Sequence, residues 1–263
     1  MGKFDSIFQQ SIENPEEFWG EAAKNITWFK ECDKVLDDSN PPFYKWFVGG
    51  KMNTCYNAVD RHVENGLGDQ TAIIYDSPVT NTIRKISYKE LQTDVSKFAG
   101  GLASLGVTKG DTVVIYMPMI PEAAVAMLAC ARLGAVHSVV FGGFAPHELA
   151  IRIDHAAPKV LITASGAIEG KKTLEYKPLV DSAIEQSTHE VANVVLFQRD
   201  MVKSEMKGDR DVDWVELAAK SDPVDCVELD ATDPLYILYT SGTTGMPKGV
   251  LRDNGGHAVA LYW

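Results

Sequence analysis

The amino-acid sequence predicts an α/β fold with a mainly parallel sheet, and three observations lead to that prediction. From about residue 70, short apolar runs of strand length alternate with helical patterns. Glycine and proline separate these segments at positions where helices begin or end. The run at 235–239 is apolar throughout, as expected for a strand that is covered on both faces. Such an alternation indicates successive βαβ units with helices on both sides of the sheet.

The first helix of this alternation is expected to follow Ser87. Ser87 and Glu90 have the spacing of a capping box, in which a serine at the N-cap is followed three residues later by a glutamate. Gly106 is expected to end the helix. Between these ends, apolar residues recur at spacings of four and three, which indicates one buried face: Leu91, Val95, Phe98, Leu102 and Leu105.

The later elements follow in the same manner. Pro118 closes a β-rich run at 112–117, Pro121 has the first position of the next helix, and Gly134 ends that helix. Beyond it we expect strands at 135–140, 159–163, 191–197 and 235–240, and helices at 146–156, 178–186 and 213–220.

Residues 1–65 are different in character, because they are rich in aromatic residues and show no regular periodicity. We predict that they form an N-terminal arm that wraps a larger body built from residues 66–263, with its aromatic side chains used for packing. The last residues, 261–263, fall inside a predicted new helix, so we expect the chain to be a truncated product.

The composition excludes several classes of protein. The 263 residues include 25 basic and 36 acidic ones, and the net charge of −11 argues against non-specific nucleic-acid binding. No apolar run approaches the roughly 20 residues of a membrane span, and the N-terminus resembles neither a secretory signal nor a transit peptide. We therefore predict a soluble intracellular protein, in the cytoplasm or the mitochondrial matrix. The oligomeric state is left open.

The cysteines and histidines show no spacing that predicts a metal site. The four cysteines are scattered and form no CxxC pair, which suits a reducing compartment. Cys130 and His137 lie in apolar segments and are expected to pack in the core. His257 is the histidine of interest, because it closely follows a glycine-rich loop in the sequence. The run Asp60–His62 is consistent with a surface ion pair.

That loop follows the apolar run at 235–239, where the sequence reads LYILYTSGTTGMPKGV over residues 235–250. Glycines let backbone N–H groups approach a polyphosphate closely, hydroxyl groups donate to its oxygens, and Lys248 adds a positive charge. The loop is not a Walker A motif, because Pro247 precedes the lysine and Gly249 follows it, and the chain contains no GxGxxG. The alternative is a flexible connector of small residues.

The loop resembles the phosphate-loop signature of the adenylate-forming superfamily, which includes acyl-CoA synthetases, luciferases and peptide-synthetase adenylation domains. Two further segments, FYKWFVGGKMNTCYNAVDRHVENG at 43–66 and VVIYMPMIPEAAVAMLACARLGAVHSVVFGGF at 113–144, are similar to the acetyl- and propionyl-CoA synthetase branch. The resemblance covers essentially the whole chain, as the N-terminal portion of such an enzyme. The segment LRDNGGHAVALYW at 251–263 looks more like propionyl-CoA synthetases.

The resemblance implies a two-step reaction with ATP, Mg²⁺ and coenzyme A. A short-chain carboxylate, propionate rather than acetate, attacks the α-phosphate of ATP to give an acyl-adenylate, and coenzyme A then displaces AMP. The loop is expected to hold the β- and γ-phosphates, with Lys248 countering their charge. The implied ATP-binding residues are Thr240, Ser241, Gly242, Thr243, Thr244, Gly245 and Lys248.

The resemblance also implies a coenzyme A site at Glu169, Gly170, Lys171 and Lys172, in a loop after the strand that ends near Thr163. The family usually has an arginine at the position matched by lysine here. A lysine attracts the 3′-phosphate of coenzyme A but cannot make the two parallel hydrogen bonds of arginine. The alternative is a solvated lysine pair on a surface turn.

Two other functions are alternatives to a synthetase. A kinase or dehydrogenase on a similar sheet would have a Walker or dinucleotide loop, and neither is present. A non-catalytic truncated isoform or binding module derived from a synthetase stays open. The family's adenine and ribose contacts and its main catalytic lysine lie beyond residue 263, so we expect that the chain alone does not synthesise acyl-CoA.

Overall fold

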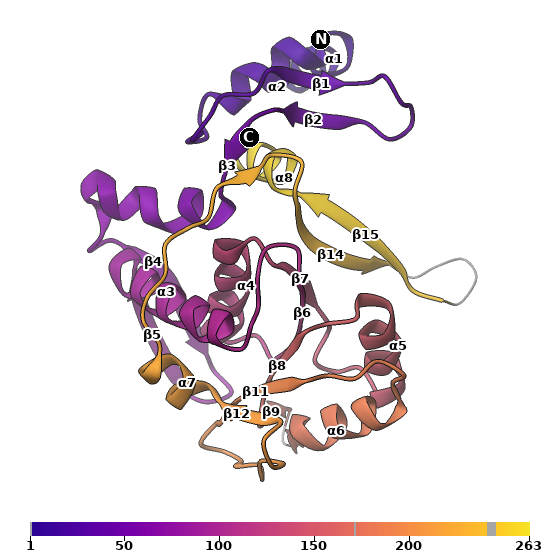
Figure 1. Cartoon of the computed structure of the whole chain (residues 1–263). Helices are drawn as coiled ribbons and strands as arrows, with labels where there is room; N and C mark the ends of the chain where they lie inside the picture. Colours follow the sequence, from indigo (N-terminus) through magenta and orange to yellow (C-terminus); the bar gives the residue numbers. More distant parts are fainter. Residues whose placement is uncertain (1, 171, 241–245) are drawn as a thin grey trace.

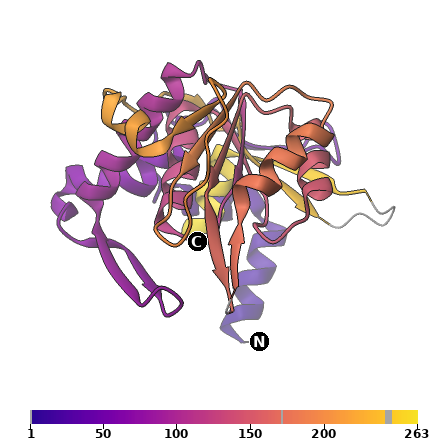
Figure 2. The same ribbon diagram turned by 90° about the horizontal axis from the view of Figure 1, so that it is seen from below.

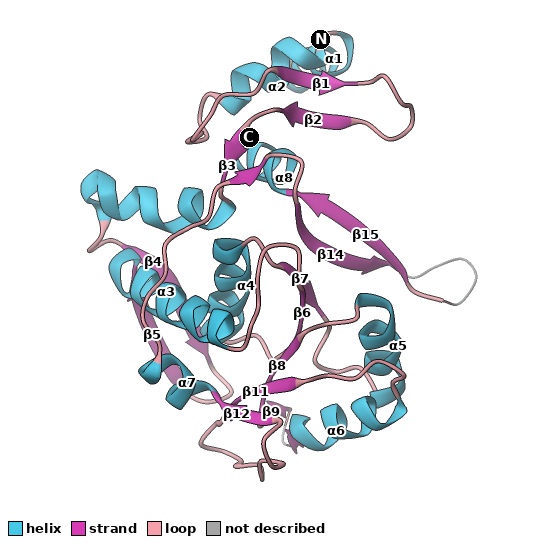
Figure 3. Cartoon of the chain, in the orientation of Figure 1, coloured by secondary structure: helices cyan, strands magenta, loops and turns pink. Residues whose placement is uncertain are grey.

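The structure, a computed structural model, describes residues 2–170, 172–240 and 246–263. Its centre is a seven-stranded sheet in which every neighbouring pair is parallel except the last, β14–β15. The α/β prediction with a mainly parallel sheet is confirmed (Figures 1 and 3). In spatial order the strands are β12 (Asp211–Asp213), β11 (Asn193–Phe197), β8 (Val160–Ala164), β6 (Thr112–Tyr116), β7 (Val136–Val139), β14 (Pro234–Thr240) and β15 (Lys248–Asp253).

Helices cover both faces of this sheet, because alternate side chains of each strand point to opposite sides. Val113 and Ile115 of β6 face α3 (Tyr88–Ser104), α4 (Pro121–Leu133) and α7 (Trp214–Lys220). Val114 and Tyr116 of the same strand face α5 (Pro146–Ala156) and α6 (Tyr176–Gln186). Figure 2 shows the two helical layers on either side of the strands. The result is two separate apolar cores, one on each face.

The helix ends lie where the capping residues predict them. Glu90 N donates to Ser87 Oγ at 3.2 Å, and Ser87 N donates to Glu90 Oε2 at 2.8 Å, so the capping box at the start of α3 is formed. Gly134 ends α4 with φ +72°, a conformation that favours glycine. A Cβ at Gly134 would lie 2.6 Å from Leu229 Cδ2, so packing requires glycine there as well.

Two antiparallel hairpins of the larger body were not predicted. One pairs β4 (Thr71–Ser77) with β5 (Thr82–Ser87) and projects from the body in Figure 2. The other pairs β9 (Gly166–Glu169) with β10 (Lys172–Glu175). Both hairpins are largely exposed, so their side chains give only a weak hydrophobic pattern.

The prediction that the N-terminal region is irregular is wrong. It contains α1 (Lys3–Glu13), α2 (Pro15–Ala23) and an antiparallel pair, β1 (Lys34–Asp37) with β2 (Lys45–Val48). After β3 (Lys51–Met52), which pairs with β13 (Leu229–Asp230), come two π-helical turns at Tyr56–Asp60 and Val63–Leu67.

The aromatic side chains of this region pack on α8 (Asn254–Tyr262), the helix expected at the end of the chain. The ring of Phe18 lies 5.4 Å from that of Trp263, between ring centroids, and Trp19 lies 5.9 Å from it. The two ends of the chain are therefore held together at one end of the molecule (Figure 1).

Candidate nucleotide-binding site

The candidate site residues follow strands of the central sheet at one common edge. Strands β8, β6, β7 and β14 run in parallel, so their carboxyl ends lie at the same edge. Ligands of open α/β sheets bind outside this edge. The β9–β10 hairpin follows β8, Phe141 follows β7 and the glycine-rich loop follows β14.

The structure shows both ends of the predicted phosphate loop. Thr240 is the last residue of β14, and it pairs directly with Lys248, the first residue of β15. Directly paired residues of an antiparallel ladder have their side chains on the same face. The hydroxyl of Thr240 and the ammonium of Lys248 therefore lie on one face of the hairpin. Ser241, Gly242, Thr243, Thr244 and Gly245 lie outside the described residues.

Lys248 is exposed, and it forms no ion pair with any residue in the described part of the chain. Its charge is therefore available to an anion. The expectation that β14 is fully buried is wrong, because only Leu235 is buried and Leu238 is 51% exposed. The β14–β15 hairpin extends beyond the helical layers, as Figure 1 shows, so its outer half lacks the cover that the inner strands have.

The hairpin that carries the loop is fixed to α5. The hydroxyl of Tyr239 lies 2.7 Å from His155 Nδ1, and the guanidinium carbon of Arg152 lies 5.4 Å from the centre of the Tyr239 ring. A Cβ at Gly249 would lie 3.1 Å from His155 Cε1, so glycine allows this close approach. Burial raises the pKa of Tyr239, so it stays a neutral phenol at physiological pH. These contacts give the mouth of the loop a defined position.

The predicted coenzyme A residues lie on a β-hairpin, and the expectation of an irregular loop is wrong. Glu169 pairs with Lys172, and Gly170 in the turn has φ +59°. Glu169, Gly170 and Lys172 are exposed, whereas Lys171 lies outside the described residues. The base of the hairpin is fixed by Arg199, whose N donates to Ser165 Oγ at 2.8 Å and whose Nη1 donates to the Gly166 carbonyl at 3.0 Å.

The β9–β10 hairpin and the mouth of the phosphate loop, at Thr240 and Lys248, lie at the same edge of the sheet. Strands β6 and β7 stand between β8 and β14, so three strand spacings, roughly 14 Å, separate the ends of β8 and β14. Figure 1 shows the β9–β10 and β14–β15 hairpins apart. An extended ligand that lies along the edge can reach both, whereas a compact one cannot.

Phe141 lies between them, and the residue-by-residue reasoning did not single it out. It follows β7 and its side chain is 67% exposed. A Cβ at Gly142 would lie 2.4 Å from the Tyr176 hydroxyl oxygen, so glycine lets the turn sit on that ring. Tyr116 donates to the Phe144 carbonyl at 2.8 Å and holds the far side of the turn. The available signal was an aromatic residue followed by two glycines directly after an apolar strand.

The core roles expected for Cys130 and His137 fit the structure. Cys130 is completely buried, and burial raises its pKa to about 12. His137 is buried against Tyr236, and burial, followed by the proximity of His257, lowers its pKa to about 4. His137 Nδ1 has no hydrogen-bond partner among the described residues. The imidazole is therefore neutral at physiological pH.

Two other expectations need correction. His257 is close to the loop in sequence but follows the opposite end of β15, roughly 17 Å from Lys248 along the strand. Its Nδ1 lies 3.3 Å from the Tyr236 hydroxyl. Asp60 is not part of a surface ion pair, because its carboxylate is buried against Arg132, with 2.8 Å between Oδ2 and Nη1. Within the described residues, no helix is both long enough and apolar enough to cross a lipid bilayer.

The chain is similar to several proteins of known family. It is 54% identical over its whole length to acyl-CoA synthetase short-chain family member 3, mitochondrial, from Rattus norvegicus, of which it covers 38%. It is 45% identical over 98% of its length to propionate–CoA ligase from Escherichia coli, of which it covers 41%. Acetoacetyl-CoA synthetase from Streptomyces lividans superposes on the whole chain with a TM-score of 0.89 and 26% identity, over 40% of that structure.

The chain thus spans about two fifths of the length of the curated relatives it matches. Residues 4–58 match the model of the acetyl-coenzyme A synthetase N-terminus. Residues 59–262, most of the chain, match the model of the AMP-binding enzymes. Together with the α/β fold and the glycine-rich loop after β14, these matches show that the chain belongs to the family of AMP-binding enzymes and corresponds to the N-terminal portion of its short-chain acyl-CoA synthetases.

Proposed function

We propose that the chain is the N-terminal part of an AMP-forming ligase that joins a short-chain carboxylate to coenzyme A through an acyl-adenylate. The observation that carries the proposal is the cross-strand pair Thr240–Lys248 at the mouth of a glycine-rich loop. It places on one face a hydroxyl and an ammonium that forms no ion pair with the residues the structure describes. This chemistry suits a polyphosphate, and the family match supports ATP as its source.

In the first half-reaction, the substrate carboxylate attacks the α-phosphate of Mg²⁺-bound ATP, the bond to the β-phosphate breaks, and pyrophosphate leaves. We assign the cradle of the β- and γ-phosphates to Thr240, the residues 241–245 and Lys248. Negative charge accumulates on the departing pyrophosphate, and an exposed lysine at the mouth of the loop can neutralise it. Tyr239 and His155 hold the loop in position for this step.

In the second half-reaction, the thiolate of coenzyme A attacks the acyl carbonyl, and AMP leaves. We assign the nucleotide end of coenzyme A to the β9–β10 hairpin, where Lys171 and Lys172 supply positive charge. The strands that lead to the hairpin and to the loop, β8 and β14, end roughly 14 Å apart along one edge, which suits an extended molecule. Phe141 is the exposed aromatic ring between them, and its face is available for stacking on a base.

We further propose propionate as the preferred acid. One relative is named a propionate–CoA ligase and another a short-chain family member, and both names describe those proteins. The domain boundary belongs to the same proposal: residues 1–65 form the arm and 66–263 the partial AMP-binding domain. The compartment, cytoplasm or mitochondrial matrix, also belongs to it.

The test is pyrophosphate exchange catalysed by a protein in which this chain is extended to the length of its relatives. Acetate, propionate and butyrate are compared at equal concentration, with and without Mg²⁺. We expect carboxylate-dependent exchange that is fastest with propionate. Faster exchange with acetate or butyrate would overturn the choice of acid alone. No exchange with any acid would overturn the ligase and favour a non-catalytic binding role.

A further inference from the structure

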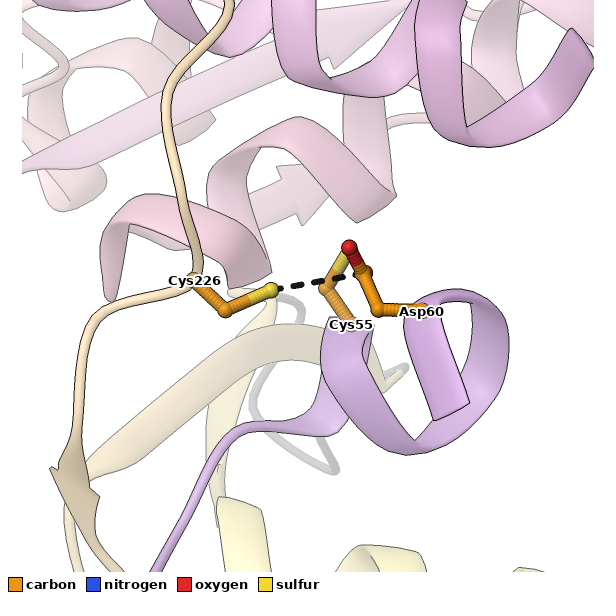
Figure 4. Close-up of side chains that lie close together, drawn as sticks. All are labelled: Cys55, Asp60 and Cys226. Atoms are coloured by element: carbon orange, nitrogen blue, oxygen red, sulfur yellow. Dashed lines mark hydrogen bonds between the residues drawn. The ribbon is translucent and has the colours of Figure 1, made fainter. Parts of the chain in front are cut away.

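Two cysteines that lie far apart in the sequence meet beside Asp60. Cys55 directly precedes the first π-helical turn, shortly after β3, whereas Cys226 lies in the connection between α7 and β13. The two sulfur atoms and a carboxylate oxygen of Asp60 all lie within 4.8 Å of one another. Figure 4 shows the three side chains converging from two separate segments.

The surroundings of this group disfavour a metal ion. The Asp60 carboxylate already binds Arg132 through both oxygens, at 2.8 Å to Nη1 and 3.0 Å to Nη2. Arg132 Nη1 also lies 3.7 Å from Cys55 Sγ. A divalent cation among these three donors would have to sit against a buried guanidinium, and the repulsion between them is strong in such a site.

The two thiols differ in their access to solvent. Cys55 is completely buried, whereas Cys226 is partly exposed. Residues 222–228 around Cys226 form neither helix nor strand. The main chain next to Cys226 is held by hydrogen bonds at Val227, whose N donates to the Arg132 carbonyl and whose carbonyl accepts from Asn53 Nδ2. Because Cys226 is the more exposed of the two thiols, it is the one that a small oxidant reaches first.

We propose that Cys55 and Cys226 form a reversible disulfide when the protein meets a peroxide, and that this bond ties the connection between α7 and β13 to the N-terminal part of the chain. In a reducing compartment both stay thiols, and disulfides that form there are typically transient.

The chemistry needs no further reactant. The sulfur of Cys226 attacks one oxygen of the peroxide, whose O–O bond breaks, and the products are a sulfenic acid and water. The sulfur of Cys55 then attacks the sulfenic sulfur, the S–O bond breaks, and a second water leaves. The hydrogen bond with Cys55, and then burial, raise the pKa of Cys226, so the first step is slower than at an activated thiol.

The bond would act on the segment that leads to the phosphate loop. Beyond Cys226 the chain enters β13, which pairs with β3, and then β14, which ends at Thr240. A cross-link at Cys226 therefore restrains the approach to β14 from one side. It also closes a long loop, the case in which a cross-link restricts the unfolded chain most.

The experiment treats the purified, reduced chain with hydrogen peroxide, removes the excess with catalase, blocks remaining thiols and maps tryptic peptides by mass. We expect one linked peptide pair that contains Cys55 and Cys226, released by dithiothreitol. Proteolytic cleavage within residues 222–228 should slow several-fold after oxidation. Cys226→Ser and Cys55→Ser should each abolish the linked pair and the protection, and Cys32→Ser, the matched control, should retain both.

Cys226 is partly exposed, so Cys226→Ser is expected to fold even if the buried Cys55→Ser does not. Oxidation of Cys226 to the sulfinic acid without a linked pair would overturn the proposal. A linked pair that contains Cys32, or one that joins two chains, would overturn it as well. So would a zinc ion that stays with the reduced wild-type chain through dialysis and is lost in Cys226→Ser.

Discussion

Asp60 and Arg132 form an ion pair in the interior, where their side chains are only 7% and 4% exposed. The pair joins the π-helical turn at Tyr56–Asp60 to the end of α4. Arg132 Nε also donates to the Val224 carbonyl, so one guanidinium connects three segments that are distant in the sequence. Burial, the largest single influence, lowers the pKa of Arg132, but the hydrogen bonds to Asp60 and the electrostatic attraction of Cys226, Cys55 and Asp60 together outweigh it and raise the pKa above its ordinary value.

Arg132→Met is expected to destabilise the chain strongly, because it leaves the carboxylate of Asp60 buried and unpaired. Removing one partner of a buried ion pair costs about 3–5 kcal/mol. Urea denaturation measures the loss. Asp60→Leu combined with Arg132→Met should recover most of it, and Lys220→Ala, which breaks the exposed pair with Glu216, should change little. Equal effects of Arg132→Met and Lys220→Ala would contradict the importance of the buried pair.

Lys248→Ala, in the extended enzyme, is expected to slow pyrophosphate exchange without weakening carboxylate binding. One cation at a phosphate site supplies a few kcal/mol, which is about 10- to 1000-fold in rate. Arg252→Ala is the matched control, since Arg252 is also exposed but lies near the other end of β15. If both substitutions slow exchange equally, the effect of Lys248 is not local to the loop.

Lys171→Glu together with Lys172→Glu, in the same extended enzyme, should leave pyrophosphate exchange unchanged and reduce thioester formation. In the proposed reaction only the second half-reaction uses coenzyme A, and the substitutions reverse the charge that we propose to attract its phosphates. The two half-reactions are measured separately, with Lys203→Glu, another exposed lysine, as the control. An equal loss in both half-reactions, or no loss in either, would indicate that the two lysines are solvated surface residues.

The stability of the chain should fall between pH 6.5 and pH 4 in part because of His137. Its pKa is about 4 in the folded state against an ordinary 6.5, so the unfolded chain takes up the proton first. The stabilisation is therefore complete above pH 6.5 and decreases as the pH falls toward 4, by about 2 kcal/mol at pH 5. His137→Gln should remove this part of the decrease between denaturation curves at pH 7 and pH 5. The substitution of the exposed His147 by Gln should leave this part of the decrease in place. If the stability of His137→Gln falls between pH 7 and pH 5 as much as that of the wild type, His137 is not its cause.

Residues 1–263 alone should release no AMP from ATP, propionate and coenzyme A. The described edge carries the groups that we propose to bind phosphates, but the chain matches less than half of the length of its relatives. Without groups that align the carboxylate with the α-phosphate, the reaction loses roughly 7–11 kcal/mol of positioning. AMP release is assayed after a thermal melt has shown that the chain is folded. Turnover equal to that of the extended enzyme would show that these residues suffice.

Local rules predicted the helices that cover the central sheet and five of its seven strands, but not β12 or β15. The capping box at Ser87 and Glu90 and the glycine at 134 act on residues close to them in the sequence. The sequence alone therefore indicates where α3 begins and where α4 ends. The β9–β10 hairpin was missed because its strands are short and exposed and its turn looks like any polar loop. The strands β4 and β5 are longer, but they are mostly exposed or half-buried, so they too give only a weak hydrophobic pattern.

The sequence predicted the loop and the lysine of the candidate site, but not how the residues of the site are arranged in space. The order of the strands in the sheet cannot be read from a single sequence. It determines the pairing of Thr240 with Lys248, the contact of Tyr239 with His155 and the exposure of Phe141. The pairing of Asp60 with Arg132 is missed for the same reason, because the two residues meet only once the sheet and α4 are assembled.

The packing of the N-terminal helices on α8 has a consequence for the order of folding. The cluster that contains Ala22, Ile26 and Phe47 is completed by Ala258 and Val259, which lie over 200 residues later in the chain. During translation, the apolar face of α2 therefore stays uncovered until α8 has left the ribosome. Contacts between such distant positions form slowly, because the chain must close a long loop before they are gained. The packing of α2 on α8 should accordingly be among the last contacts to become protected when residues 1–263 are refolded.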